Sequence, residues 1–166
     1  MFLAKASSEA NPEILSAIGR VVIESSRLEY ELALIVSHLI DSTDEKVGWI
    51  VTAGASVKTL SPLLLSLYEY RVKDEGKIEH LKKLLSKCQK LSNYRNVYVH
   101  SAWISHHPLD SALQQKATKK LKNGFNAKVE FVPASDINKL ADEISEIIEK
   151  IWTVFLEWME QNRTTA

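Results

Sequence analysis

Cysteine is nearly absent from this sequence, and Cys88 is the one example. A single cysteine excludes an intramolecular disulfide and any zinc site built on several thiolates. Cys88 falls among the apolar residues of a helical segment, where a cysteine usually behaves as a small buried hydrophobic side chain. We therefore expect a structural residue at this position and not a reactive thiol.

An excess of either charge sign is also lacking, because 21 Lys and Arg residues are matched by 21 Asp and Glu residues. The total charge gives no indication of nucleic-acid or membrane binding, although a balanced total can conceal a local patch. No apolar run is long enough to span a membrane, and the first residues, MFLAKASSEANPE, do not resemble a signal peptide. A cytoplasmic protein without membrane contact is the expectation that follows.

Glycine and proline are scarce, with 5 and 4 residues, which favours long regular elements over loops. Apolar residues recur at helical spacing in four long segments, and 166 residues favour a single domain covering 1–166. The expected fold is all-α, an up-down bundle of four main helices with a short second helix. The main helices are expected at about 12–40, 55–72, 78–102 and 135–161, and the short one at about 42–52.

The boundaries of these helices carry recognisable signals. Asn11-Pro12 is a strong helix start, because asparagine caps a helix and proline suits its first position. Ser42 or Thr43 is expected to cap the short helix, and Ser135 the last one. Between about 103 and 133 the pattern changes to alternation. The dipeptide Asn123-Gly124 there predicts a β-hairpin with strands at roughly 112–121 and 126–132.

Two charged residues interrupt the apolar faces of the long helices. At 100° per residue, Arg95 falls at about 140° within an apolar arc of about 80° to 240°, and Glu29 falls inside the arc of the first helix. A lone buried charge is costly, whereas a guanidinium and a carboxylate on facing helices stabilise each other. We therefore predict that Glu29 and Arg95 pair. Such a pair also has a purely structural interpretation, in which it fixes the register of two helices and takes part in no reaction.

The sequence around Arg95 supports a second interpretation of this residue. Arg95-Asn96-Val97-Tyr98-Val99-His100 has a polar residue directly after the arginine and a histidine after four intervening residues. It resembles the signature of the HEPN superfamily, the higher eukaryotes and prokaryotes nucleotide-binding domains. That family is an all-helical bundle with this motif on a late helix, and many members carry a glutamate in the first long helix, as Glu29 does here.

The resemblance implies a metal-independent endoribonuclease that needs no cofactor and acts as a homodimer, with two motifs facing each other across a cleft. It implies that His100 is the general base or acid at the ribose 2′-hydroxyl, a task suited to a side chain that ordinarily titrates near neutral pH. Arg95 would stabilise charge on the phosphate, Asn96 would orient the histidine or the phosphate, and Glu29 and Tyr98 would be supporting residues. The product would be a 2′,3′-cyclic phosphate. Such enzymes occur in toxin–antitoxin and phage-defence systems, so an antitoxin or another regulatory protein is an implied partner.

Several weaker signals accompany the motif. The hairpin region carries an excess of lysines that either contact an RNA backbone or protect an exposed strand edge. The lysines considered for RNA binding are Lys116, Lys119, Lys120 and Lys122. His106 and His107 lack nearby carboxylate or thiolate ligands and are expected to be loop residues, so no metal site is predicted.

Two other functional interpretations stay open beside the ribonuclease. One is a HEPN-like module that binds RNA, a nucleotide or a protein without cutting, with a structural pair between Glu29 and Arg95. The other is an unrelated helical bundle that matches the motif by chance. The sequence contains no Gly-rich phosphate-binding loop, zinc spacing or nucleophile elbow that would indicate a different enzyme class.

Overall fold

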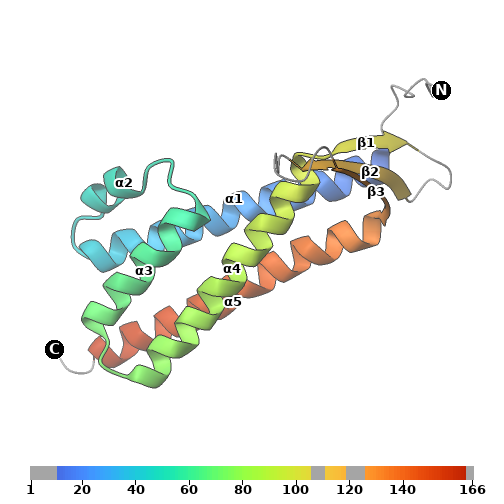
Figure 1. Ribbon diagram of the computed structural model, residues 1–166. Coiled ribbons are helices and arrows are strands. Elements are labelled where there is room, and N and C mark those ends of the chain that lie inside the picture. Colours follow the sequence, from blue (N-terminus) through green and yellow to red (C-terminus); the bar gives the residue numbers. More distant parts are fainter. Residues whose placement is uncertain (1–10, 106–110, 119–125, 164–166) are drawn as a thin grey trace. The chain divides into compact units, whose positions relative to one another are not determined.

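The computed structural model describes residues 11–105, 111–118 and 126–163 (Figure 1). Within the strands, side chains are described only for Ala102, Trp103, Gln114 and residues 130–133. The described chain is mostly helical, which confirms the expected fold at this level. The helices are α1 (Pro12–Ile40), α2 (Lys46–Thr52), α3 (Val57–Arg71), α4 (Glu75–Val99) and α5 (Ala134–Arg163). The strands are β1 (Ala102–Ser105), β2 (Ser111–Thr118) and β3 (Asn126–Pro133).

Contacts divide the chain into two compact units that share three helices. The first unit comprises the described residues up to Ile23 and those from Asn93 to Asp142. The second comprises Glu24–Ser92 and the described residues from Glu143 onward. Each of α1, α4 and α5 therefore supplies residues to both units, and each unit is described by itself below. The prediction of one domain over 1–166 stays a prediction.

The second unit has a large apolar core supplied by four helices. Polar contacts run along the outside of this core. The Trp152 indole donates to the Glu31 carboxylate at 2.9 Å, and the Lys77 ammonium donates to the Gln161 amide oxygen at 2.6 Å. These contacts place α1 and α4 against α5 within this unit. Its buried residues include Leu28, Leu32, Ile35, Leu39, Leu60, Leu64, Tyr68, Leu81, Leu85, Cys88, Ile144, Ile147, Ile148 and Ile151.

The first unit combines the start of α1, the end of α4, the strands and the start of α5. Arg20 of α1 forms an ion pair with Asp142 of α5 and also contacts Asn138. The Asn11 side-chain oxygen accepts a hydrogen bond from the Glu13 amide at 2.9 Å, which confirms the predicted helix start. The buried apolar residues of this unit include Ile14, Ala17, Val21, Val132, Ile137, Leu140 and Ala141.

Other predicted helix boundaries were wrong. The cap of α2 is Glu45, which makes no side-chain cap bond, and not Ser42 or Thr43. The Asp41 carboxylate instead binds the amide and hydroxyl of Thr43, and these hydrogen bonds lower the pKa of Asp41. Ser135 lies inside α5, which begins one residue earlier.

The predicted end of the fourth helix at Ala102 was also wrong. Helix α4 ends at Val99, and Ala102 begins β1. The strands form one antiparallel sheet in the order β1-β2-β3, with Trp103 opposite Gln114 and Lys116 opposite Lys128. Because Asn123-Gly124 lies outside the described residues, the hairpin closed by that turn stays a prediction.

No helix in the described ranges is both long enough and apolar enough to cross a membrane.

Cys88 is fully buried, as expected, and burial raises the pKa of its thiol to about 12. A folded-state pKa above the unfolded value of roughly 8.5 favours the folded state below that pH, and this contribution is lost as pH rises toward the folded value. We expect a thiol-specific dye to leave the native protein unlabelled at pH 8 and to label it fully in urea.

The matched variant for this prediction is Cys88→Ala, which removes the titrating group. Between pH 8.5 and 11, the free energy of unfolding should fall more steeply for the wild type than for Cys88→Ala. Rapid labelling of the native protein, or equal slopes for both proteins, would contradict the burial of this thiol.

Candidate functional site

The motif residues lie at the C-terminal end of α4, in the first unit. Arg95 and Asn96 belong to the last turns of the helix, and His100 directly follows its final residue, Val99. The His100 amide donates to the Asn96 carbonyl at 3.1 Å, so the helical hydrogen bonding extends one residue beyond Val99. Asn96 and His100 are exposed, and Arg95 is half-buried. All three are therefore close in the chain, with two of them open to solvent.

Arg95 is oriented by its neighbour. Its Nη1 donates a hydrogen bond to the Asn96 side-chain oxygen at 3.0 Å, whereas its Nε is buried without a hydrogen-bond partner. Within the described residues of this unit, no carboxylate forms an ion pair with Arg95. A guanidinium has five N–H donors in a fixed plane, so Asn96 uses only one of them. The arrangement leaves a positive, directional donor group available to an anion.

A small hydrogen-bond network fixes the chain beyond the end of the helix. Gln114 of β2 is 5% exposed, and its amide nitrogen donates to the Ser101 hydroxyl at 2.9 Å and to the Val97 carbonyl at 3.3 Å. The Ser101 hydroxyl itself donates to Val97, and the Trp103 indole donates to the Tyr98 carbonyl at 2.9 Å. These side chains satisfy carbonyls that the ending helix leaves without amide partners. They also explain why the helix stops before Ala102.

Tyr98 lies in the last turn of α4, and its ring centroid is 6.1 Å from that of Trp103 in β1. Burial raises the pKa of the Tyr98 phenol, and the charges of Asp136, Tyr94 and Glu130 act in the same direction. The phenol therefore keeps its proton to a higher pH than an exposed tyrosine does. The supporting role expected for Tyr98 stays a prediction.

Glu29 lies in the second unit, so its predicted pair with Arg95 joins residues of different units and stays a prediction. The helical wheel placed Glu29 on the apolar face, and its side chain is half-buried. Within the described residues of its own unit, the Glu29 carboxylate makes no hydrogen bond or ion pair. It lines a pocket with Trp49 and Ser56 instead.

The predicted lysine surface is described only in part. Lys116 lies in β2 opposite Lys128, but its side chain is not described. Lys119, Lys120, Lys122, His106 and His107 lie outside the described residues, so their predicted roles stay predictions. Among the described side chains, no group of three or more His, Cys, Asp or Glu residues is arranged to hold a metal ion.

Two features of the site were missed by sequence reasoning. Gln114 was not considered, because its partners depend on the register of β1 with β2, which no local pattern specifies. Tyr94 is 60% exposed directly before Arg95, although a tyrosine in a long helix is more often assigned to the core. On the wheel that places Arg95 at about 140°, Tyr94 falls at about 40°, outside the apolar arc of about 80° to 240°, and this signal was present in the spacing.

No family model, curated protein or solved structure matches the chain in comparisons with known proteins.

Proposed function

We propose that the protein is a metal-independent endoribonuclease of HEPN-like type, with Arg95, Asn96 and His100 as its catalytic group. The observation that carries the proposal is the state of Arg95. Its guanidinium is oriented by Asn96 and has no carboxylate partner in the described part of its unit, and an exposed histidine follows it five positions later. A guanidinium neutralised by a carboxylate would be a poor phosphate ligand, and no carboxylate in the described part of its unit pairs with Arg95.

The proposed reaction uses the RNA's own 2′-hydroxyl as nucleophile. His100 takes the proton from this hydroxyl, its oxygen attacks the adjacent phosphorus, and the bond from phosphorus to the 5′-oxygen breaks. The leaving 5′-oxygen receives a proton from solvent or from a second His100. The products are a 2′,3′-cyclic phosphate and a 5′-hydroxyl end. Arg95 stabilises the charge that gathers on the phosphate oxygens, and Asn96 holds Arg95 in position for this task.

The proposed active form is a homodimer. His100 lies five positions after Arg95, which places the two residues about 140° apart on an ideal helix. One helix therefore presents them on different sides, whereas the His100 of a second copy is free to approach the Arg95 of the first. The proposed fold of each copy is the up-down bundle of four main helices, with α2 as the short helix and the hairpin inserted before α5.

The test is an RNA cleavage assay with purified wild-type protein, EDTA and RNAs of varied sequence and structure. We expect cleavage that persists in EDTA and leaves 2′,3′-cyclic phosphate ends, detected by their resistance to 3′-end ligation until a phosphatase that opens cyclic phosphates is added. Loss of cleavage in EDTA, or products with 3′-hydroxyl ends, would contradict the proposed chemistry.

The alternative is a binding module in which the same residues hold an RNA or nucleotide phosphate without cutting. The separation of about 140° between Arg95 and His100 favours this alternative. With that separation, a single copy does not place the histidine beside a phosphate held by Arg95. A folded wild type that binds these RNAs with strong salt dependence but cleaves none of them would support this alternative.

A further inference from the structure

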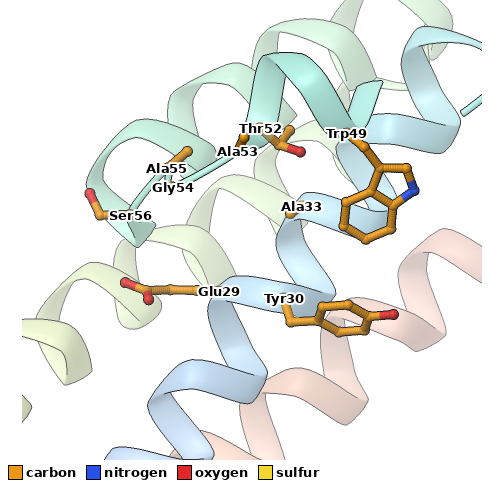
Figure 2. A pocket seen from close by; sticks show the side chains of 9 residues that line it. All are labelled: Glu29, Tyr30, Ala33, Trp49, Thr52, Ala53, Gly54, Ala55 and Ser56. Atoms are coloured by element: carbon orange, nitrogen blue, oxygen red, sulfur yellow. The ribbon is translucent and has the colours of Figure 1, made fainter. Parts of the chain in front are cut away.

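A pocket in the second unit lies between α1 and the segment that joins α2 to α3 (Figure 2). Its volume is about 330 Å³, enough for a small organic group. It belongs wholly to this unit and contains none of Arg95, Asn96 or His100. Its lining residues are Glu29, Tyr30, Ala33, Trp49, Thr52, Ala53, Gly54, Ala55 and Ser56.

One end of the pocket is aromatic. The rings of Tyr30 and Trp49 lie against each other with centroids 5.6 Å apart and planes tilted by 31°. Figure 2 shows both rings at the same end, with the Trp49 indole above Tyr30. Tyr30 is exposed and Trp49 half-buried, so this aromatic wall is open to a ligand. Flat aromatic faces attract apolar chains and cationic groups.

The other end of the pocket carries two polar side chains, those of Glu29 and Ser56. The Glu29 carboxylate extends to the end away from the two rings, below Ser56 (Figure 2). Ser56 occupies the N-cap position of α3, yet its side chain makes no capping hydrogen bond. Within this unit's described residues, neither the Glu29 carboxylate nor the Ser56 hydroxyl has a hydrogen-bond partner. Both are therefore acceptors available to a donor group.

The middle of the pocket is kept clear by small residues. Ala33, Ala53 and Gly54 line it and have no side chain large enough to fill it. Gly54 has φ of 68°, a left-handed conformation that favours glycine and turns the chain from α2 into α3. The Thr52 hydroxyl is already bonded to the Gly48 carbonyl at 2.9 Å and does not compete for a ligand. A narrow apolar stem would fit between the aromatic end and the carboxylate end.

We propose that this pocket binds an organic cation, an ammonium or guanidinium group carried on an apolar stem. Glu29 and Ser56 accept hydrogen bonds from the cationic group, and Tyr30 and Trp49 cover the stem. A carboxylate that has no partner among the described residues of its unit excludes an anionic ligand by repulsion and gains a charge-assisted hydrogen bond from a cationic one. The source is either a free amine or a lysine or arginine side chain, since both present the same chemistry. This proposal does not depend on the proposed ribonuclease activity.

The test compares three probes of equal chain length that differ in charge: pentylammonium, 1-pentanol and pentanoate. Binding to the wild-type protein is followed by NMR at the Gly54 amide and the Trp49 indole N–H. We expect pentylammonium to bind roughly ten times more tightly than pentanol, because a hydrogen bond to a charged group contributes about this much to affinity. Pentanoate should bind most weakly. Equal affinities for the ammonium and the alcohol would overturn the proposal.

Variants test the contributions of the two ends of the pocket separately. Glu29→Gln keeps the shape of the side chain and should abolish the preference for pentylammonium over pentanol, while Trp49→Leu should weaken both probes. Glu69→Gln is the matched control, because Glu69 is exposed on α3, carries the same charge change and lies away from the pocket residues. Preserved ammonium preference in a folded Glu29→Gln protein would also overturn the proposal.

A further comparison identifies the source of the cation. An N-acetylated, C-amidated Leu-Lys-Leu peptide presents the same ammonium between apolar side chains. The two leucine side chains of the peptide can reach the exposed Val47, Ile50 and Val51 of α2, next to Trp49. Tighter binding of this peptide than of pentylammonium would assign the pocket to a protein side chain. Equal or weaker binding would assign it to a free amine.

Discussion

Replacing His100 with alanine is expected to lower the rate of RNA cleavage by a factor of roughly 10² to 10⁴, the usual contribution of a general acid or base. The loss should appear in the rate of cleavage at saturating protein, because His100 is proposed to move a proton and not to hold the RNA. Its side chain is exposed and makes no hydrogen bond within the described residues of its unit. The variant should therefore keep the wild-type thermal unfolding temperature and RNA affinity.

His80→Ala is the matched control for this prediction. His80 is an exposed histidine on the same helix, α4, outside the motif, so its removal makes the same chemical change without touching the proposed site. Cleavage by His80→Ala should equal that of the wild type. If a folded His100→Ala protein cleaves at the wild-type rate, His100 is not the proton-transfer group, and the activity belongs to other residues.

Arg95→Lys completes the comparison, because lysine keeps the charge but loses the planar set of donors. The hydrogen bond between Arg95 and Asn96 depends on that plane, so we expect most of the activity to be lost despite the conserved charge. Retention of full activity would show that only charge is required at this position.

Replacing Gly48 with alanine is expected to lower the stability of the protein more than replacing any other glycine that the structure describes. A Cβ atom at Gly48 would lie 2.4 Å from the Ser37 Cα and 2.5 Å from its Cβ. Trimming the Ser37 side chain would not relieve the first of these contacts, because Cα belongs to the backbone. Helix α2 would have to move away from α1, and overpacking of this kind costs about 1–3 kcal/mol or more.

Gly19→Ala is a control for which the expected change in the free energy of unfolding has the opposite sign. Gly19 lies inside α1, and a Cβ added there meets no other atom within 4 Å. Alanine should stabilise this helix by roughly 0.5–1 kcal/mol, because glycine loses more backbone entropy on folding. Urea unfolding of both variants measures the two shifts. A Gly48→Ala protein as stable as the wild type would mean that α2 does not depend on this close approach to α1.

Local patterns in the sequence were sufficient to predict the long helices. The apolar spacing and the Asn11-Pro12 start define α1 at both ends, because a helix is determined largely by residues three and four positions apart. The end of α4 was not predictable in the same way. Val99 and Ala102 continue the apolar pattern. The carbonyls at the end of the helix are bonded instead by the side chains of Ser101, Trp103 and Gln114, which the apolar spacing does not indicate.

The candidate site was predictable in its residues but not in its contacts. The motif spelling selected Arg95, Asn96 and His100, whereas the bond between Arg95 and Asn96 depends on side-chain rotamers that spacing does not specify. For Glu29, the helical wheel indicated an apolar face but not which element covers it. The segment from Thr52 to Ser56 covers it, because Gly48 allows α2 to approach α1 at Ser37.

The sharing of three helices between the units has a consequence for how the chain can be divided. A fragment that begins at Asn93 would contain the proposed catalytic residues and the sheet, but would lack Ile14, Ala17 and Val21, which α1 supplies to the core of the same unit. A fragment that ends at Ser92 would lose α5 and with it a whole side of the other core. Every cut that follows the unit boundary divides a continuous helix, so neither unit exists as a single excisable stretch of sequence.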